Sequence, residues 1–256
     1  MSKYNLICGD CLQKMQAIPD ASIDLILCDL PYGITDCKWD NIIPFDDLWQ
    51  QYNRITKDNS AIVLFGNEPF TSQMICSNLI GFKYRIDWNK MIPSGFGYAK
   101  YRPMQQTEDI AIFTKKGKKT TYNPQMIKRE KPIKSGGNNI QAGVYNGFKC
   151  RGKGKKYERI YQYKFPTTLI KFMKIRKGAI HPTQKPVALL EYLVKTYTNA
   201  GDVVLDNCMG SGSTGVACAN TDRDFIGIEL DENYFNIAKN RIEAAYNAPC
   251  LFTENG

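Results

Sequence analysis

Segments typical of buried strands alternate with segments typical of amphipathic helices at both ends of this chain of 256 residues. Toward the N-terminus, we expect strands at 23–29, 61–66, 82–90 and 109–115, and helices at 44–56 and 69–81. Toward the C-terminus, we expect helices at 186–198, 213–220 and 231–246, and strands at 202–206 and 225–230. Such an alternation is typical of a doubly wound parallel sheet. We therefore predict an α/β fold with a mostly parallel sheet.

The middle of the chain lacks this alternation and carries most of the positive charge. Residues 115–177 hold 19 of the 34 Lys and Arg residues, together with only two acidic residues, Glu130 and Glu158. The rest of the chain contains 15 basic and 23 acidic residues. Basic residues interleaved with aromatic rings favour a nucleic acid partner over a membrane surface, and a solvated basic loop is the alternative. We predict one domain split into halves, 1–114 and 181–256, by a basic insertion at 115–180.

The cysteines and the hydropathy of the chain argue against a metalloprotein and a membrane protein. The nine cysteines are scattered, and the chain has one histidine, His181, and one C-x-x-C pair, Cys8 and Cys11. We therefore expect no metal site and a reducing compartment. No apolar run approaches the roughly 18 residues of a membrane span, and the polar start is unlike a signal peptide. A cytoplasmic protein is expected.

The stretch CDLPYG, residues 28–33, follows the apolar run of the first expected strand. It places an acid at Asp29, a rigid bend at Pro31 and a ring at Tyr32 where the strand ends. Ligands of open α/β sheets bind at the carboxyl ends of the strands. The stretch therefore predicts a functional site, although an ordinary Asp-Pro-Gly turn is the alternative.

A glycine loop follows the strand expected at 202–206. Gly210, Gly212 and Gly215 fit the spacing G-x-G-x-x-G, and Glu229 ends the next strand. Glycines allow a ligand to approach the backbone, and an acid at the following strand end can accept hydrogen bonds from ribose hydroxyls. The pattern predicts an adenosine-containing cofactor, either a nicotinamide dinucleotide or S-adenosylmethionine.

The order of the motifs along the chain distinguishes between these two cofactors. DLPYG comes first, the basic segment follows, and HPTQKP and DNCMGSGSTGVACA come last. In this order the chain resembles the β class of amino-methylating DNA methyltransferases. The resemblance implies a Rossmann-like methyltransferase fold with circularly permuted motifs, S-adenosylmethionine as cofactor, and target recognition by the basic insertion.

The resemblance also implies roles for individual residues. The catalytic motif would be Asp29, Leu30, Pro31 and Tyr32, with Leu30 where the family usually has proline. Cofactor contacts would come from Asp10, Cys11, His181, Lys185, Asp206, Cys208, Gly210, Gly212 and Glu229. Cys208 stands where the family usually has a phenylalanine beside the cofactor. Candidate DNA contacts in the basic insertion are Lys128, Arg129, Arg151, Lys153, Lys155, Lys156 and Arg159.

The expected reaction is methyl transfer to the N6 amino group of adenine in double-stranded DNA, with the base flipped out of the stack. The Asp29 carboxylate and a backbone carbonyl of the Leu30–Pro31 turn would accept the two amino N–H groups, and Tyr32 would stack on the base. Cytosine N4 is the nearest alternative. A catalytically silent DNA-binding module, a nicotinamide-dependent dehydrogenase, and methylation of RNA or protein are more distant ones. The family resemblance also suggests a homodimer and a partner restriction endonuclease.

Overall fold

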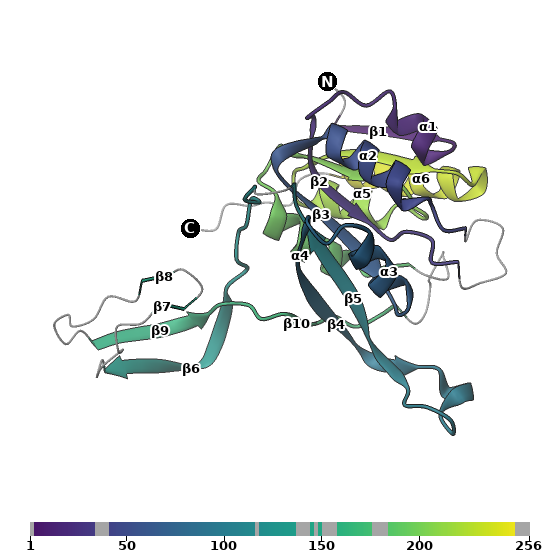
Figure 1. Ribbon diagram of the computed structural model, residues 1–256. Helices are drawn as coiled ribbons and strands as arrows, with labels where there is room; N and C mark the ends of the chain where they lie inside the picture. Colours follow the sequence, from purple (N-terminus) through teal and green to yellow (C-terminus); the bar gives the residue numbers. More distant parts are fainter. Residues whose placement is uncertain are drawn as a thin grey trace. The chain divides into compact units, whose positions relative to one another are not determined.

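In the described part of the chain, eight strands form the central sheet in the order β1–β12–β11–β2–β3–β5–β4–β10 (Figure 1). This computed structural model describes residues 3–33, 41–115, 118–136, 144–145, 148–149, 158–175 and 184–248. The strands of the sheet are β1 Tyr4–Cys8, β2 Ile23–Cys28, β3 Thr56–Gly66, β4 Phe82–Ser94, β5 Gln105–Phe113, β10 Leu169–Lys171, β11 Val203–Asp206 and β12 Asp224–Glu229. Strand β5 is antiparallel to β3 and β4, and the other neighbouring pairs are parallel. The predicted α/β fold with a mostly parallel sheet is confirmed.

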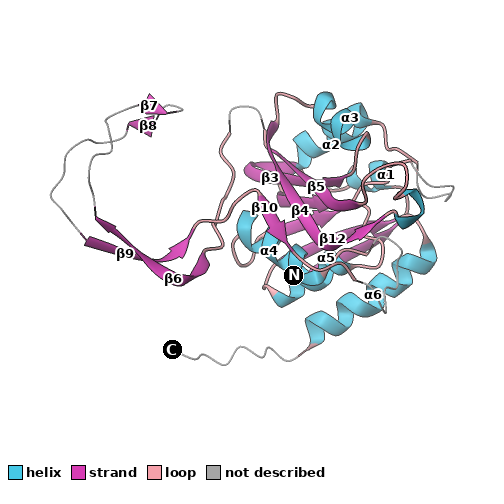
Figure 2. Cartoon of the chain, turned by 90° about the horizontal axis from the view of Figure 1, so that it is seen from below, coloured by secondary structure: helices cyan, strands magenta, loops and turns pink. Residues whose placement is uncertain are grey.

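Helices cover both faces of this sheet (Figure 2). One face carries α1 Cys11–Met15, α2 Phe45–Ile55 and α3 Phe70–Ser77, and the other carries α4 Val187–Tyr197, α5 Ser213–Asn220 and α6 Glu232–Asn247. Strand β2 is buried along its whole length, because Leu25 and Leu27 pack on the α4–α6 side while Ile26 and Cys28 pack on the α1–α3 side. In a sequence, a strand that is covered on both faces appears as a nearly continuous run of apolar residues, and this pattern predicted β2.

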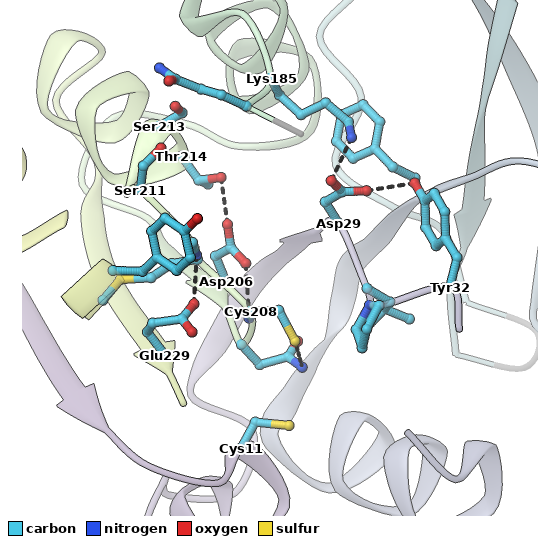
Figure 3. Close-up of a pocket in the computed structure, with 18 of the residues that line it drawn as sticks. Cys11, Asp29, Tyr32, Lys185, Asp206, Cys208, Ser211, Ser213, Thr214 and Glu229 are labelled. Carbon is cyan, nitrogen blue, oxygen red and sulfur yellow. Dashed lines mark hydrogen bonds and ion pairs between the residues drawn. The ribbon is translucent and has the colours of Figure 1, made fainter. Parts of the chain in front are cut away.

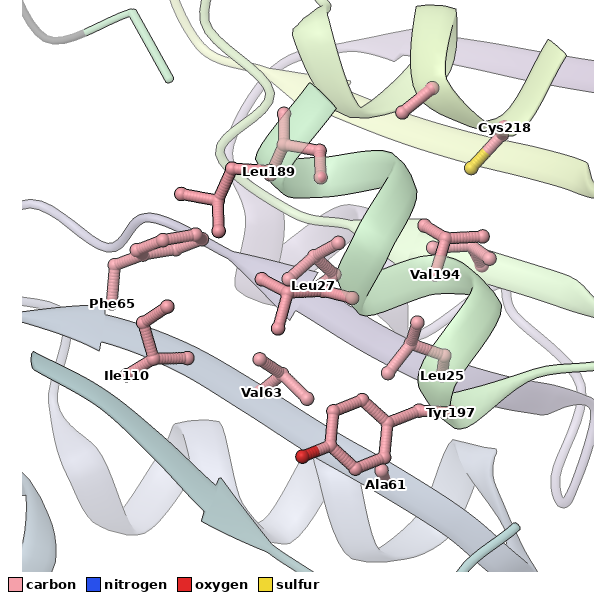
Figure 4. Close-up of a cluster of buried hydrophobic side chains, with 14 of the residues drawn as sticks. Leu25, Leu27, Ala61, Val63, Phe65, Ile110, Leu189, Val194, Tyr197 and Cys218 are labelled. Atoms are coloured by element: carbon pink, nitrogen blue, oxygen red, sulfur yellow. The ribbon is translucent and has the colours of Figure 1, made fainter. Parts of the chain in front are cut away.

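Helix α4 forms much of the core above β2 and β3 (Figure 4). Its side chains Leu189, Leu193 and Tyr197 recur every four residues and are all buried. This spacing places them on one face of a helix, over the apolar side chains of the sheet. The core therefore holds α4, which follows the motif HPTQKP, directly against β2, the strand that Asp29 follows.

Several elements differ from the sequence-based expectation. The helix expected to reach residue 81 ends at Ser77, because Asn78 leaves the helical conformation and its carbonyl accepts the N–H groups of Gly81 and Phe82. Strand β3 begins at Thr56 instead of residue 61. The short elements β1, α1 and β10 were not expected, since three to five residues give little periodicity to read.

Residues 124–167 form a compact unit of their own, and residues 1–123 and 168–256 form the other. In the smaller unit, β6 Ile127–Gly136 pairs antiparallel with β9 Glu158–Lys164, and β7 Val144–Tyr145 pairs with β8 Phe148–Lys149. The unit lies inside the expected insertion at 115–180, whose described ends belong to the larger unit. Thr121 and Asn123, for example, bond to the backbone of Asn59 and Thr196. Its role in target recognition stays a prediction.

Membrane insertion has no candidate segment among the described residues. None of their helices combines the length and the hydropathy that a membrane span requires.

Two glycines of the G-x-G-x-x-G motif, Gly212 before α5 and Gly215 within it, are needed for helix packing. A Cβ on Gly212 would lie 2.9 Å from the Cβ of Ala238, and one on Gly215 would lie 2.6 Å from Cδ1 of Ile242. Both Ala238 and Ile242 are fully buried on α6. These glycines therefore let α6 approach the start of α5, which is a different role from the ligand contact expected for Gly212.

Replacing Gly215 by Ala is expected to lower the free energy of unfolding by about 1–3 kcal/mol, because the added methyl group overpacks a closed core. Chemical denaturation measures this change. Gly97→Ala is the matched control, since a Cβ there has no neighbour within 4 Å. Adding Ile242→Val to Gly215→Ala should restore part of the lost stability, because valine lacks the Cδ1 atom that the new Cβ meets. Equal stability of Gly215→Ala and wild type would contradict the packing role.

Candidate active site

The two sequence motifs meet in one pocket at the carboxyl edge of the sheet. Strands β12, β11 and β2 are parallel neighbours, so their ends bring Glu229, Asp206 and Asp29 to the same edge. A cavity of about 600 Å³ lies there, and all three carboxylates line it (Figure 3). This volume is within the usual range for a small-molecule site. One ligand could therefore span the glycine loop and the DLPYG turn.

Both oxygens of the Asp29 carboxylate are hydrogen-bonded. The hydroxyl of Tyr32 donates to Oδ1 at 2.5 Å, and the ammonium group of Lys185 donates to Oδ2 at 2.5 Å. The Lys185 ammonium also lies 2.9 Å from Oε1 of Glu108 and 5.0 Å from the centre of the Phe65 ring. The other oxygen of Glu108 is 3.5 Å from the ammonium of Lys90. Asp29 therefore ends a chain of alternating buried charges.

The charges around Asp29 act on its pKa in opposite directions. Burial raises the pKa of Asp29 and Glu108 raises it further, whereas Lys185 and the Tyr32 hydroxyl lower it, with a net increase. For Lys185, burial lowers the pKa, but the carboxylates of Asp29 and Glu108 more than reverse this effect and raise it. Lys185 therefore stays protonated and is the main group that favours the ionised form of Asp29.

Carboxylates also organise the glycine loop. Asp206 accepts the hydroxyl of Thr214 at 2.6 Å and the backbone N–H of Cys208 at 3.1 Å. Burial raises the pKa of Asp206 to about 7, although these two hydrogen bonds oppose the increase. Glu229 accepts the N–H groups of Gly210 at 2.8 Å and Asp231 at 2.9 Å. The loop is thus fixed by side chains at the ends of two adjacent strands.

Three thiols, those of Cys11, Cys28 and Cys208, lie together beneath the loop. The hydrogen bond with Cys208 and then burial raise the pKa of Cys11, and burial raises the pKa of Cys28 to about 12. These thiols are therefore protonated and act as small apolar groups. Beside them, the buried Tyr52 hydroxyl donates to Oδ1 of Asn207 at 2.6 Å. Within the described residues, no group of three or more His, Cys, Asp or Glu side chains is arranged to hold a metal ion.

Comparisons with known proteins identify the family. A family model described as DNA methylase (N6_N4_Mtase) matches residues 23–240, which is most of the chain. The chain belongs to this DNA methylase family. It is 28% identical to the type II methyltransferase M.HpaI of Haemophilus parainfluenzae over 94% of this chain and 75% of the relative. It is 29% identical to the DNA adenine methyltransferase YhdJ of Escherichia coli K12, over 94% and 83% respectively.

The chain is also similar in structure to a solved protein. The crystal structure of the M1.HpyAVI–SAM complex superimposes with a TM-score of 0.62 at 28% identity, covering 93% of this chain and 99% of that one. The family expected from DLPYG, HPTQKP and the glycine loop is therefore confirmed.

Most residues that the family resemblance implied are brought together by the fold. The pocket is lined by Asp10, Cys11, Asp29, Leu30, Pro31, Tyr32, Lys185, Asp206, Cys208, Gly210 and Glu229. Gly212 does not line it and packs against α6 instead. His181 lies outside the described residues. Lys185, expected at the cofactor, forms ion pairs with Asp29 and Glu108.

Two pocket residues that matter for Asp29 were missed by the sequence reading. Glu108 and Lys90 come from β5 and β4 and are almost fully buried. Because β5 runs antiparallel, the start of this strand lies at the carboxyl edge of its neighbours. Glu108 directly precedes the strand expected at 109–115, and an acid there becomes informative only when the direction of the strand is known.

The candidate DNA contacts lie in the smaller unit, and the structure describes part of them. Lys128 is exposed on β6, and Arg129 donates from Nε to the carbonyl of Tyr163 at 3.3 Å. The backbone of Arg159 belongs to β9, while its side chain is not described. Arg151, Lys153, Lys155 and Lys156 lie outside the described residues. Their role in binding DNA stays a prediction.

Proposed function

We propose that this chain is an S-adenosylmethionine-dependent DNA methyltransferase that acts on the N6 amino group of adenine. The observation that carries the proposal is the single pocket lined by the Asp29 turn and by the loop between Asp206 and Gly210. Membership of the DNA methylase family and the similarity to a DNA adenine methyltransferase support the same reaction. The acid that leads the turn favours adenine over cytosine, as the family resemblance implies.

The pocket fits the cofactor at the glycine-loop end. Both oxygens of the Glu229 carboxylate accept backbone N–H groups, and each retains acceptor capacity for a ribose hydroxyl. Asp10 lines the same pocket, as do Leu12, Cys208 and Leu230, and a carboxylate together with apolar groups suits an adenine ring and its amino group. One oxygen of Asp10 serves the start of α1 by accepting the N–H of Gln13. When bound, S-adenosylmethionine supplies an activated methyl group on a positively charged sulfur atom.

Glu229→Ala is expected to weaken S-adenosylmethionine binding at least about tenfold, because charged hydrogen bonds to the ribose and to the Gly210 loop are lost together. Isothermal titration calorimetry measures the dissociation constant. Asp224→Ala is the matched control, since Asp224 lies at the opposite end of the same strand and outside the pocket. Unchanged affinity in Glu229→Ala would show that the cofactor does not use this carboxylate.

At the other end of the pocket, Asp29 is placed to accept an amino N–H. An exocyclic amino group attacks poorly because its lone pair is delocalised into the ring, and an accepting carboxylate favours the form that can attack. The Tyr32 hydroxyl and Lys185 each use one lone pair of the carboxylate, so acceptor capacity remains. Once the methyl group has been transferred, the carboxylate stabilises the positive amino group and helps its proton leave.

The target base has to leave the helix to reach this acid. Tyr32 packs one side of its ring near Phe70, with ring centres 4.9 Å apart and an interplanar angle of 32°. We propose that a flipped base stacks on the other side. The exposed basic residues of the smaller unit, such as Lys128, would neutralise phosphates of duplex DNA. The proposal includes the cytoplasmic location expected from the sequence, and it is compatible with the homodimer and the partner endonuclease that the family resemblance allows.

Methyl transfer from radiolabelled S-adenosylmethionine to unmethylated genomic DNA tests the proposal, followed by digestion and mass spectrometry of the nucleosides. The proposal predicts N6-methyldeoxyadenosine. N4-methyldeoxycytidine would support the cytosine alternative. DNA binding without any methyl transfer would identify a silent DNA-binding module and contradict the proposed enzyme. Transfer to RNA or protein and not to DNA would also contradict it. The dehydrogenase alternative leaves the Asp29 turn without a role.

A further inference from the structure

The hairpin between β4 and β5 extends from the wall of the pocket. Strand β4 runs in the same direction as β2 and β3, so its end lies at the same carboxyl edge. Trp88 and Lys90 of β4 and Glu108 of β5 line the pocket. Beyond Lys90 the two strands continue past their neighbours to the hairpin tip, residues 95–102, at the lower right of Figure 1. Gly95 follows Lys90 by five positions, which is at most about 17 Å of extended chain.

The base of this hairpin is fastened to the pocket wall. The side-chain amide of Gln105 donates to Oδ1 of Asn67 at 2.6 Å, and that of Gln106 donates to Oδ1 of Asn89 at 3.2 Å. Asn67 itself lines the pocket. Met91 has a φ of 62°, a left-handed conformation that is uncommon for such a residue, and its N–H bonds to Oδ1 of Asn89. The hairpin therefore leaves the pocket at a defined, locally strained position.

The hairpin tip is ordered by its own backbone. Gly95, with a φ of 87°, starts a short 3-10 helix at Phe96–Tyr98, and the carbonyl of Tyr98 accepts the N–H groups of Tyr101 and Arg102. The guanidinium of Arg102 lies 5.4 Å from the centre of the Tyr98 ring. The tip thus has a defined backbone from which its side chains project.

Large aromatic rings on this tip are exposed. Phe96 is 82% exposed, Tyr98 62% and Tyr101 86%. The fold gains little from rings that stay in water, and three of them gathered at one edge mark an interaction site. Residues 91–107 also contain Lys100 and Arg102 and no acidic residue. Rings between cations form a surface suited to nucleobases and phosphates.

We propose that the hairpin tip is a second DNA-contact surface, on which Phe96 and Tyr101 stack on nucleobases exposed next to the flipped target base. The proposal rests on the proposed function, because DNA with a base in the pocket has to cross the same edge. The rings would replace stacking that is lost when the target leaves the helix, and Lys100 and Arg102 would contact the neighbouring phosphates. This surface is separate in sequence from the basic segment at 115–177.

Fluorescence anisotropy on two labelled oligonucleotides tests the proposal: a continuous 30-base-pair duplex, and the same duplex with three unpaired nucleotides at its centre. The double variant Phe96→Ala, Tyr101→Ala is expected to bind the interrupted duplex at least about tenfold more weakly than wild type, with a much smaller loss on the continuous duplex. The double variant Lys100→Gln, Arg102→Gln should lose affinity on both and show a shallower dependence on salt.

Leu79→Ala, Ile80→Ala is the matched control, because these side chains are 63% and 66% exposed at the other end of β4. Wild-type affinity of Phe96→Ala, Tyr101→Ala for the interrupted duplex would overturn the proposal. Light scattering provides a second test. If wild type is a dimer and this variant is a monomer, the tip contacts a second copy of the chain, and the proposal is overturned. Wild-type methyl transfer to genomic DNA is measured separately, so failure of the proposed enzyme and failure of this surface give different results.

Discussion

Asp29→Ala is expected to lower the single-turnover rate of methyl transfer at least about 100-fold, because the acceptor that activates the amino group and stabilises its positive charge is lost. Asp29 lies 2.5 Å from the Lys185 ammonium and retains 21% side-chain exposure, so one side of it remains open to the pocket. The rate is measured with saturating S-adenosylmethionine and unmethylated genomic DNA, which separates chemistry from binding and product release.

Cofactor affinity is the control for this variant. The glycine loop is held by Asp206 and Glu229, and neither of them bonds to Asp29. S-adenosylmethionine should therefore bind Asp29→Ala about as tightly as wild type. A full methyl-transfer rate in Asp29→Ala would remove this carboxylate from the mechanism. A lost rate together with lost cofactor binding would show that Asp29 has a structural role.

Lys185→Met is expected to move the acid limb of the pH–rate profile to higher pH. Methyl transfer needs the ionised form of Asp29, and Lys185 lowers the pKa of Asp29 against burial and Glu108, which raise it. Without the ammonium group, Asp29 is protonated over a wider pH range, so between pH 5 and pH 9 the rate should fall most at the acid end and recover as the pH rises. The measurement is the rate of methyl transfer across this range.

Two further variants separate an electrostatic role of Lys185 from a structural one. Glu108→Gln removes a charge that raises the pKa of Asp29, so the acid limb should move to lower pH, opposite to Lys185→Met. Lys185→Arg keeps the positive charge and should leave the limb near its original position. A loss of rate in Lys185→Met that is the same at every pH would mean that the ammonium group does not set the protonation of Asp29.

The sequence was informative where residues are covered on both sides or repeat with a helical period. The largely apolar run at Ile23–Cys28 and the amphipathic segment at 186–198 gave the correct elements. Asp29 and Glu229 could also be placed at one edge, because the ends of parallel strands coincide. The family motifs then predicted most of the residues that were expected at the site and that line the pocket.

The sequence could not show contacts that depend on strand direction or on distant segments. Glu108 reaches the pocket because β5 is antiparallel, and Lys185 meets Asp29 across 156 positions of the chain. The packing of Gly212 against α6 could not be predicted, because the motif does not reveal how closely that helix approaches it. The exposed rings at Phe96 and Tyr101 lie between the strands expected at 82–90 and 109–115, and their exposure could not be predicted, since exposure is a property of the folded chain.

A crystal structure with S-adenosylmethionine bound gives the most direct test that both motifs serve one reaction. We expect the ribose at Glu229 and the transferable methyl group directed toward Asp29, with room between them for one nucleobase amino group at about 3–3.5 Å from the methyl carbon. A methyl group that points away from Asp29, or a cofactor bound outside this pocket, would contradict the proposed mechanism.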